Sequence, residues 1–226
     1  AKIVRKSSGV MANNLDITGD GTGYVRITGG TWSDEKSGTD AIIQADNVGT
    51  LETIGVNSSN AGCVVRAVNC IQSNFVRGKH VGNNGNIAAT TMRSNNCKSA
   101  SATNGMYQDV SHMLDISSLN TGDGTSGATI VTGNIGRGTT DTAIFLRLLG
   151  STTVAYRHRV VCSGNILEDV GKAGIKFTAP SSVANVSSVL EQFLCSDNII
   201  KGFGLLVSSP AIAVFRDASD NTITIN

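Results

Sequence analysis

Three carboxylates in the second half of the chain have the residue types and spacing needed for acid–base chemistry. Asp141, Glu168 and Asp169 follow the Asn of a recurring phrase by seven, three and four residues. Hydrolysis of a glycosidic bond uses two carboxyl groups, about 5–5.5 Å apart in retaining enzymes and about 6.5–9.5 Å apart in inverting ones. Carboxylates at matching positions of neighbouring parallel strands would lie about 5 Å apart. If the chain cleaves such bonds, we predict that Asp141 acts with Glu168 or Asp169.

Basic residues close to these carboxylates in the sequence are predicted to bind a substrate: Arg137, Arg147 and Lys172. A lyase would instead need a Lys, Arg or His base and a group that neutralises a carboxylate, and no motif singles out such a set. Aromatic residues are only 4% of the chain, so a rich stacking platform for sugars is not expected. The competing interpretation is that all of these charges are solvated and lie on loops outside the core.

No motif that holds a metal or a cofactor is present. The five cysteines form no CxxC pair, and we interpret them as free thiols, with Cys162 and Cys195 as small core residues in one stack. Free thiols fit assembly in a reducing cytosol. The three histidines lack metal-ligand spacing and are predicted to be surface or loop residues. Each TGDGT turn supplies one Asp, Asp20 or Asp123, whereas a calcium loop needs several. We therefore predict no metal and no cofactor.

The composition narrows the class of protein. Charged residues are 15% of the 226 and the formal net charge is +1, which argues against a nucleic-acid partner. No stretch approaches 18 apolar residues, so membrane insertion is not predicted. The chain has 26 Gly but only 2 Pro, and 40% of its residues are hydrophobic, enough for a long thin core. The opening AKIVRKSSGV lacks the apolar centre of a signal peptide.

A short phrase returns four times in the second half, as VTGNI (131–135), CSGNI (162–166), CSDNI (195–199) and ASDNTI (218–223). Its Asn residues are 31, 33 and 23 residues apart, a spacing typical of solenoid repeats: Asn134, Asn165, Asn198 and Asn221. Asn tolerates the left-handed backbone of a tight corner, and its amide can bond the Asn one coil along. In the earlier, less regular coils we assign the corner to Asn74 and Asn96. The phrase predicts a ladder of stacked Asn corners.

Aligning the coils on the Asn predicts which side chains stack. Val131, Cys162 and Cys195 would form one inward ladder, and Thr129, Val160 and Phe193 another, because they are alternate positions of one strand. Further along, Ile144 and Leu146 would stack on Ile175 and Phe177, and then on Leu205 and Val207. The residues between them, Phe145, Lys176 and Leu206, would face outward. With Leu149, they predict an outward apolar stripe and a homotrimer that buries it.

The elements between the motifs are short β-branched or aromatic runs bounded by Gly, Asp, Asn and Thr turns, with no convincing amphipathic helix. The predicted fold class is all-β, a single-stranded right-handed parallel β-helix of about eight coils. At about 4.8 Å per coil, this rod would be on the order of 40 Å long. Residues 1–20 are predicted to be a capping segment that leads into the first coil, and residues 21–226 the β-helix domain.

The Asn phrase, the Gly-Asp-Gly-Thr turns and the GIxF strand at 174–177 resemble the right-handed parallel β-helix of the pectate-lyase-like superfamily. The Gly, Asn, Ser and Thr richness is most similar to the β-helical part of bacteriophage tailspikes. That resemblance implies a structural and receptor-binding protein of the virion tail, assembled in the host cytoplasm, that attaches to the host cell surface. It implies bacterial surface polysaccharide, other virion tail proteins and two further copies of the chain as partners. The alternative on the same scaffold is a polysaccharide depolymerase, either an endoglycosidase or a lyase. An ice-binding solenoid is disfavoured because regular T-x-T arrays are absent.

Overall fold

The computed structural model describes residues 2–5, 15–34, 41–59, 63–82, 90–118, 127–148, 157–179, 189–205 and 208–216. In these ranges every regular element is a β-strand, and the strands form three entirely parallel sheets. Sheet A contains β1 (Lys2–Arg5), β4 (Thr31–Asp34), β7 (Asn57–Ser59), β10 (Lys79–Val81), β13 (Met106–Gln108), β16 (Ile135–Arg137), β19 (Ile166–Glu168) and β22 (Ile199–Lys201). Sheet B contains β2 (Leu15–Thr18), β5 (Ala41–Asp46), β8 (Cys63–Val68), β11 (Thr90–Cys97), β14 (His112–Ser118), β17 (Ile144–Leu148), β20 (Ile175–Ala179) and β23 (Ile212–Arg216). Sheet C contains β3 (Tyr24–Thr28), β6 (Thr50–Ile54), β9 (Gln72–Val76), β12 (Ser99–Thr103), β15 (Gly127–Thr132), β18 (Arg157–Ser163) and β21 (Val189–Ser196).

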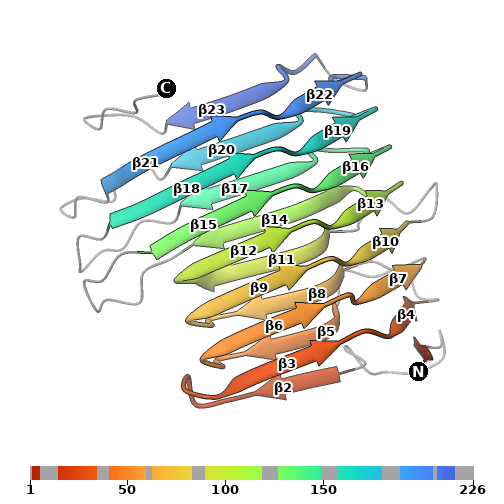
Figure 1. Ribbon diagram of the computed structural model, residues 1–226, viewed down its shortest axis with the longest axis vertical. Helices are drawn as coiled ribbons and strands as arrows, with labels where there is room; N and C mark the ends of the chain where they lie inside the picture. The colour runs from red at the N-terminus through yellow and green to blue at the C-terminus, as the bar shows by residue number, and fades with distance from the viewer. Residues whose placement is uncertain are drawn as a thin grey trace.

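The chain visits the sheets in the order B, C, A, and each strand pairs with the strand three positions later. In Figure 1 the strands of sheets C and A run from left to right across the front, while those of sheet B return behind them as the chain climbs. This winding is right-handed, as expected for crossovers between parallel strands. The predicted right-handed parallel β-helix is therefore confirmed, while the coil number of the whole chain stays a prediction. Residues 1–20 contribute β1 and β2, the first strands of sheets A and B.

The core is a stack of inward side chains, one layer per coil. Val131 pairs with Cys162, and Cys162 with Cys195, so the predicted inward ladder is confirmed. Ile144 and Leu146 pair with Ile175 and Phe177 as predicted, and all four side chains are buried. The alternation of strand side chains thus sends one apolar row inward on each sheet.

The predicted continuation of sheet B is wrong. Ile212 and Val214, not Leu205 and Val207, pair with Ile175 and Phe177. The arc between β22 and β23 is longer than the arc between β19 and β20, so counting from the Asn stops short of the strand. Ala213 therefore takes the outward place beside Lys176 that was predicted for Leu206. Leu149, Leu206 and Val207 lie outside the described residues.

The Asn ladder is confirmed at three of its four predicted positions, and Asn221 lies outside the described residues. Asn134 Nδ2 donates to Asn165 Oδ1 at 3.0 Å, and Asn165 Nδ2 donates to Asn198 Oδ1 at 2.8 Å. The left-handed backbone, however, lies one residue earlier, at Gly133, Gly164 and Asp197, with φ of 67°, 63° and 56°. The Asn side chain holds the corner through hydrogen bonds, and the preceding residue makes the turn.

A second set of Asn residues lies at a different corner, between sheets B and C. Asn47, Asn69 and Asn96 have positive φ of 53°, 53° and 55°, and Asn96 Nδ2 donates to Asn69 Oδ1 at 3.4 Å. Asn74, predicted to be a corner residue, lies instead within β9 and pairs with Ser101. Asn74 therefore lies within a strand and Asn96 at the corner between sheets B and C, so neither belongs to the predicted ladder.

Candidate functional site

The predicted catalytic residue Asp141 lies in the arc between β16 and β17, where Lys172 Nζ binds its Oδ2 at 2.6 Å. The Thr142 N–H donates to Asp141 Oδ1 at 2.7 Å. Burial raises the pKa of Asp141, but the hydrogen bonds from Lys172 and Thr142 outweigh it and leave the pKa below its ordinary value. Asp141 is therefore an ionised, cation-bound carboxylate at neutral pH.

Glu168 lies at the end of β19, directly beside Arg137 of β16. Arg137 Nε donates to Glu168 Oε2 at 3.0 Å, and its Nη2 forms a second, shorter contact with the same oxygen. The hydrogen bond from Arg137 lowers the pKa of Glu168, and its charge adds to the effect. The register thus places Glu168 beside Arg137, and Asp141 beside Lys172, instead of placing two carboxylates opposite each other.

Asp169 occupies the corner between sheets A and B. Its φ is 54°, and the equivalent corners of other coils have Asp109, Gly138 and Gly202, also with positive φ. Asp and Gly tolerate this left-handed conformation better than most residues, so the backbone accounts for the residue type. Of the three residues predicted to be catalytic, Asp141 and Glu168 each form an ion pair and Asp169 forms a corner. Their catalytic roles stay predictions.

A different set of charged residues gathers on the outer face of sheet B. The register aligns Arg66, Arg93, Asp115, Phe145 and Lys176 in one row across five successive strands. Leu114 and Ile116, on either side of Asp115, pair with the core residues Ile144 and Leu146. Because strand side chains alternate, Asp115 points to the outer face even though its side chain is only 6% exposed.

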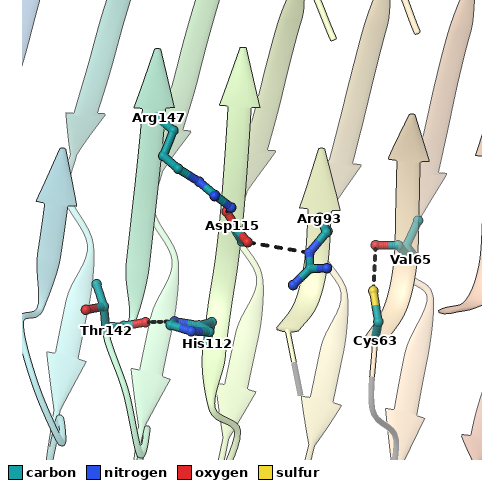
Figure 2. Close-up of polar contacts among 7 residues, drawn as sticks. All are labelled: Cys63, Val65, Arg93, His112, Asp115, Thr142 and Arg147. Atoms are coloured by element: carbon teal, nitrogen blue, oxygen red, sulfur yellow. Dashed lines mark hydrogen bonds and ion pairs between the residues drawn. The ribbon is translucent and has the colours of Figure 1, made fainter. Parts of the chain in front are cut away.

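Asp115 is covered by two arginines from the neighbouring strands, as Figure 2 shows. Arg93 Nε lies 3.4 Å from Asp115 Oδ2, and Arg147 Nη2 donates to Asp115 Oδ1. The arginine side chains are 29% and 35% exposed, so each guanidinium lies between the buried carboxylate and solvent. We call this Arg93–Asp115–Arg147 set the charged triplet. Its carboxylate holds two cationic groups in fixed positions on three adjacent strands.

A groove of about 490 Å³ opens beside the charged triplet. Its lining residues are Val68, Arg93, Asn95, Asn96, Ser117 and Arg147. The volume lies within the range of small-ligand sites, and all but one of these side chains can form hydrogen bonds. We refer to it as the sheet B groove. It suits a polar ligand that accepts hydrogen bonds from guanidinium, amide and hydroxyl groups.

Phe145 lies next to the groove, below a layer of cations. Arg147 Cζ and Lys176 Nζ lie 4.7 and 5.0 Å from the centre of its ring, within the range of cation–π contacts. The imidazole of His112 lies 6.5 Å from the same ring, centre to centre. His112 Nδ1 donates to the carbonyl oxygen of Thr142 at 2.7 Å (Figure 2). The surface around Phe145 is therefore cationic and not an open apolar stripe.

Of the residues predicted to bind a substrate, only Arg147 lines the groove. Arg137 and Lys172 lie elsewhere, on β16 and in the arc after β19. The sequence analysis missed Arg93, Asn95, Asn96, Asp115 and Ser117. A signal existed, because Arg66, Arg93 and Asp115 follow one another at coil-like spacings of 27 and 22 residues.

The histidines and cysteines add little to this surface. His80 and His158 are buried in the core, so their predicted surface positions are wrong. Burial lowers the pKa of His80 to about 3 and that of His158 to about 4. The cysteines are free thiols as predicted, four buried and Cys195 half-buried.

Asp20 accepts hydrogen bonds from the amide and hydroxyl of Thr22, as a tight turn requires, and Asp123 lies outside the described ranges. Within those ranges no group of three His, Cys, Asp or Glu residues could hold a metal ion. No helix in the same ranges is long and apolar enough to cross a membrane.

No protein-family model matches the chain, and no curated protein or solved structure matches it either. The similarity to tailspikes and pectate-lyase-like proteins therefore rests on sequence pattern and on the parallel β-helix itself. Because one fold supports many functions, the parallel β-helix by itself does not define what the chain binds.

Proposed function

We propose that this chain is a receptor-binding β-helix of the tailspike type that binds bacterial surface polysaccharide along the outer face of sheet B. The observation that carries the proposal is the groove of about 490 Å³ lined by amide, hydroxyl and guanidinium groups. Sugar hydroxyls and ring oxygens pair with such groups. A row of strands with a constant spacing also offers an extended ligand a repeated set of contacts.

Binding without cleavage has more support than depolymerase activity. A glycosidase needs one carboxylic acid with a raised pKa as proton donor. Hydrogen bonds from basic residues lower the pKa of both Asp141 and Glu168 below their ordinary values. A depolymerase acting through this pair would need those ion pairs to rearrange when the substrate binds.

Binding to a panel of purified capsular polysaccharides and lipopolysaccharides, measured by biolayer interferometry, tests the proposal. We expect at least one polysaccharide to bind the wild-type protein, and Asn95→Ala with Ser117→Ala to weaken that binding at least fivefold. Thr50→Ala on sheet C is the matched control and should bind as the wild type does. Binding that survives the groove substitutions, or is absent across a broad panel, would contradict the proposal. Gel filtration of the incubated polysaccharide detects any shortening of its chains.

We also propose that the chain assembles into a homotrimer on the virion tail, together with other tail proteins. Exposed apolar side chains follow one another along sheet A instead of sheet B, at Met106, Ile135 and Ile199, which are 49%, 42% and 47% exposed. These residues share one register row, so a second copy would cover a continuous strip. Sedimentation velocity should give a trimer for the wild type and smaller species for Ile135→Asp. A wild-type monomer at micromolar concentration would contradict this assembly.

A further inference from the structure

We propose that the sheet B groove is an anion subsite that accepts the carboxylate of an acidic sugar residue, with Arg147 as a hydrogen-bond donor, Arg93 as a second cation and Asp115 as a positioning residue. This inference rests on the proposed glycan-binding function and names the chemistry of its ligand.

The outer face of sheet B around the groove carries more positive than negative charge. From β8 to β20, the described outward residues of sheet B include four cations, Arg66, Arg93, Arg147 and Lys176, and one carboxylate, Asp115, whereas the preceding strands β2 and β5 carry the outward carboxylates Asp16 and Asp46. The whole chain has a formal net charge of only +1, so this local excess is not a general property of the surface. A local positive potential in a groove attracts and holds an anion.

The geometry of the charged triplet holds its arginines in place beside the groove. Asp115 Oδ1 accepts a hydrogen bond from Nη2 of Arg147, and its Oδ2 lies 3.4 Å from Nε of Arg93, an ion-pair contact without a hydrogen bond. A guanidinium has five N–H donors, and Asp115 takes a hydrogen bond from one nitrogen of Arg147, so Arg147 has more donors than this contact uses. Because Asp115 already holds both side chains, a ligand loses less binding energy in ordering them.

The groove also contains neutral groups that suit a sugar ring. Asn95, Asn96 and Ser117 lie along the same groove as the arginines. A planar carboxylate matches the fork of a guanidinium, and amide and hydroxyl groups match the hydroxyls on the rest of a sugar ring. A site for a bare inorganic anion needs no such neutral partners.

Ligand-observed saturation-transfer NMR with sodium D-glucuronate tests the subsite on the full chain, and D-glucose is the neutral counterpart. We expect glucuronate to bind with millimolar affinity and glucose at least tenfold more weakly. Arg147→Gln should weaken glucuronate binding at least fivefold. Arg147→Lys, which keeps the charge and the pairing with Asp115 but not the planar fork, should weaken it to an intermediate extent and protects the test against misfolding. Arg26→Gln, which removes an arginine paired with Glu52 on sheet C, is the matched control and should change it less than twofold.

Three results with small ligands would overturn the anion subsite. The first is equal binding of glucose and glucuronate, and the second is unchanged glucuronate binding by both Arg147 variants. The third is that sulfate or phosphate displaces glucuronate at one tenth of the concentration at which acetate displaces it. The last result would assign the site to an inorganic or ester oxyanion. A polysaccharide that binds equally well after its carboxyl groups are reduced to alcohols would also exclude the subsite, while leaving glycan binding intact. Glucuronate binding without any polysaccharide binding would instead contradict the proposed function alone.

Discussion

Replacing Asp115 by Asn should destabilise the β-helix, because it leaves two arginines of the charged triplet facing each other without a carboxylate. Removal of one partner from a buried ion pair costs about 3–5 kcal/mol, whereas exposed pairs contribute about 0–1 kcal/mol. The Asp115 side chain is 6% exposed, but those of Arg93 and Arg147 are 29% and 35% exposed, so solvent takes over part of the lost interaction. We therefore expect a loss of about 2 kcal/mol in the free energy of unfolding.

Urea unfolding followed by circular dichroism measures this loss, with equal m-values required for the comparison. In the Arg147→Gln background, the same Asp115→Asn substitution should cost at least about 1 kcal/mol less, since the two residues interact directly. Glu168→Gln, which removes a carboxylate from the more exposed pair with Arg137, is the matched control and should have a much smaller effect. A loss below about 0.5 kcal/mol, or strictly additive effects of Asp115 and Arg147, would refute the reasoning.

Three further predictions concern the core. Asn165→Ala removes hydrogen bonds to both neighbouring coils, and should lower the free energy of unfolding by about 2–4 kcal/mol in urea titrations; a change below about 0.5 kcal/mol would show that the Asn ladder does not hold the corner. Burial lowers the pKa of His80 to about 3 and that of His158 to about 4, so as the pH falls the unfolded chain takes up a proton on each histidine before the folded chain does. The stabilisation should be complete above pH 6.5 and should be lost as the pH drops towards 4 and then 3, by on the order of 3–5 kcal/mol per histidine. A flat profile of unfolding midpoint against pH over this range would contradict this prediction. Cys195 is half-buried and the hydrogen bond from Cys162 lowers its pKa, whereas the other four thiols are buried, so Ellman's reagent should modify Cys195 first in the native protein. Faster reaction of Cys63, whose pKa is raised by burial, or of Cys70, whose pKa is lowered to about 7, would exclude this order.

The sequence predicted the fold wherever a repeat was regular. Val131, Cys162 and Cys195 stack as expected because strand side chains alternate and the Asn phrase marks the same corner in each coil. The predicted pairing of Leu205 with Ile175 was wrong because the arc before β23 is longer than the arc before β20. An arc outside the core can change length without disturbing the stack. Counting residues predicts a register only between arcs of equal length.

The candidate site was harder to predict because its charges come from the irregular part of the chain. From the sequence, Asp141 and Lys172 fall in equivalent arcs of neighbouring coils, as do Arg137 and Glu168, but nothing in it indicates that each carboxylate is neutralised by a cation 31 residues away. Arg93 and Asp115 precede the regular repeats, so no shared phrase aligned them with Arg147. The coil-like spacing of Arg93 and Asp115 was a signal in the sequence, but the register that brings Arg147 to Asp115 came only from the three-dimensional structure.

A crystal structure of the protein with a bound acidic oligosaccharide tests the central claim most directly. We predict that a sugar carboxylate lies within hydrogen-bond distance of Arg147, and that the ring contacts Asn95, Asn96 or Ser117 in the sheet B groove. An oligosaccharide bound beside Asp141 and Lys172, or on another sheet, would contradict the assignment of this groove as the binding site.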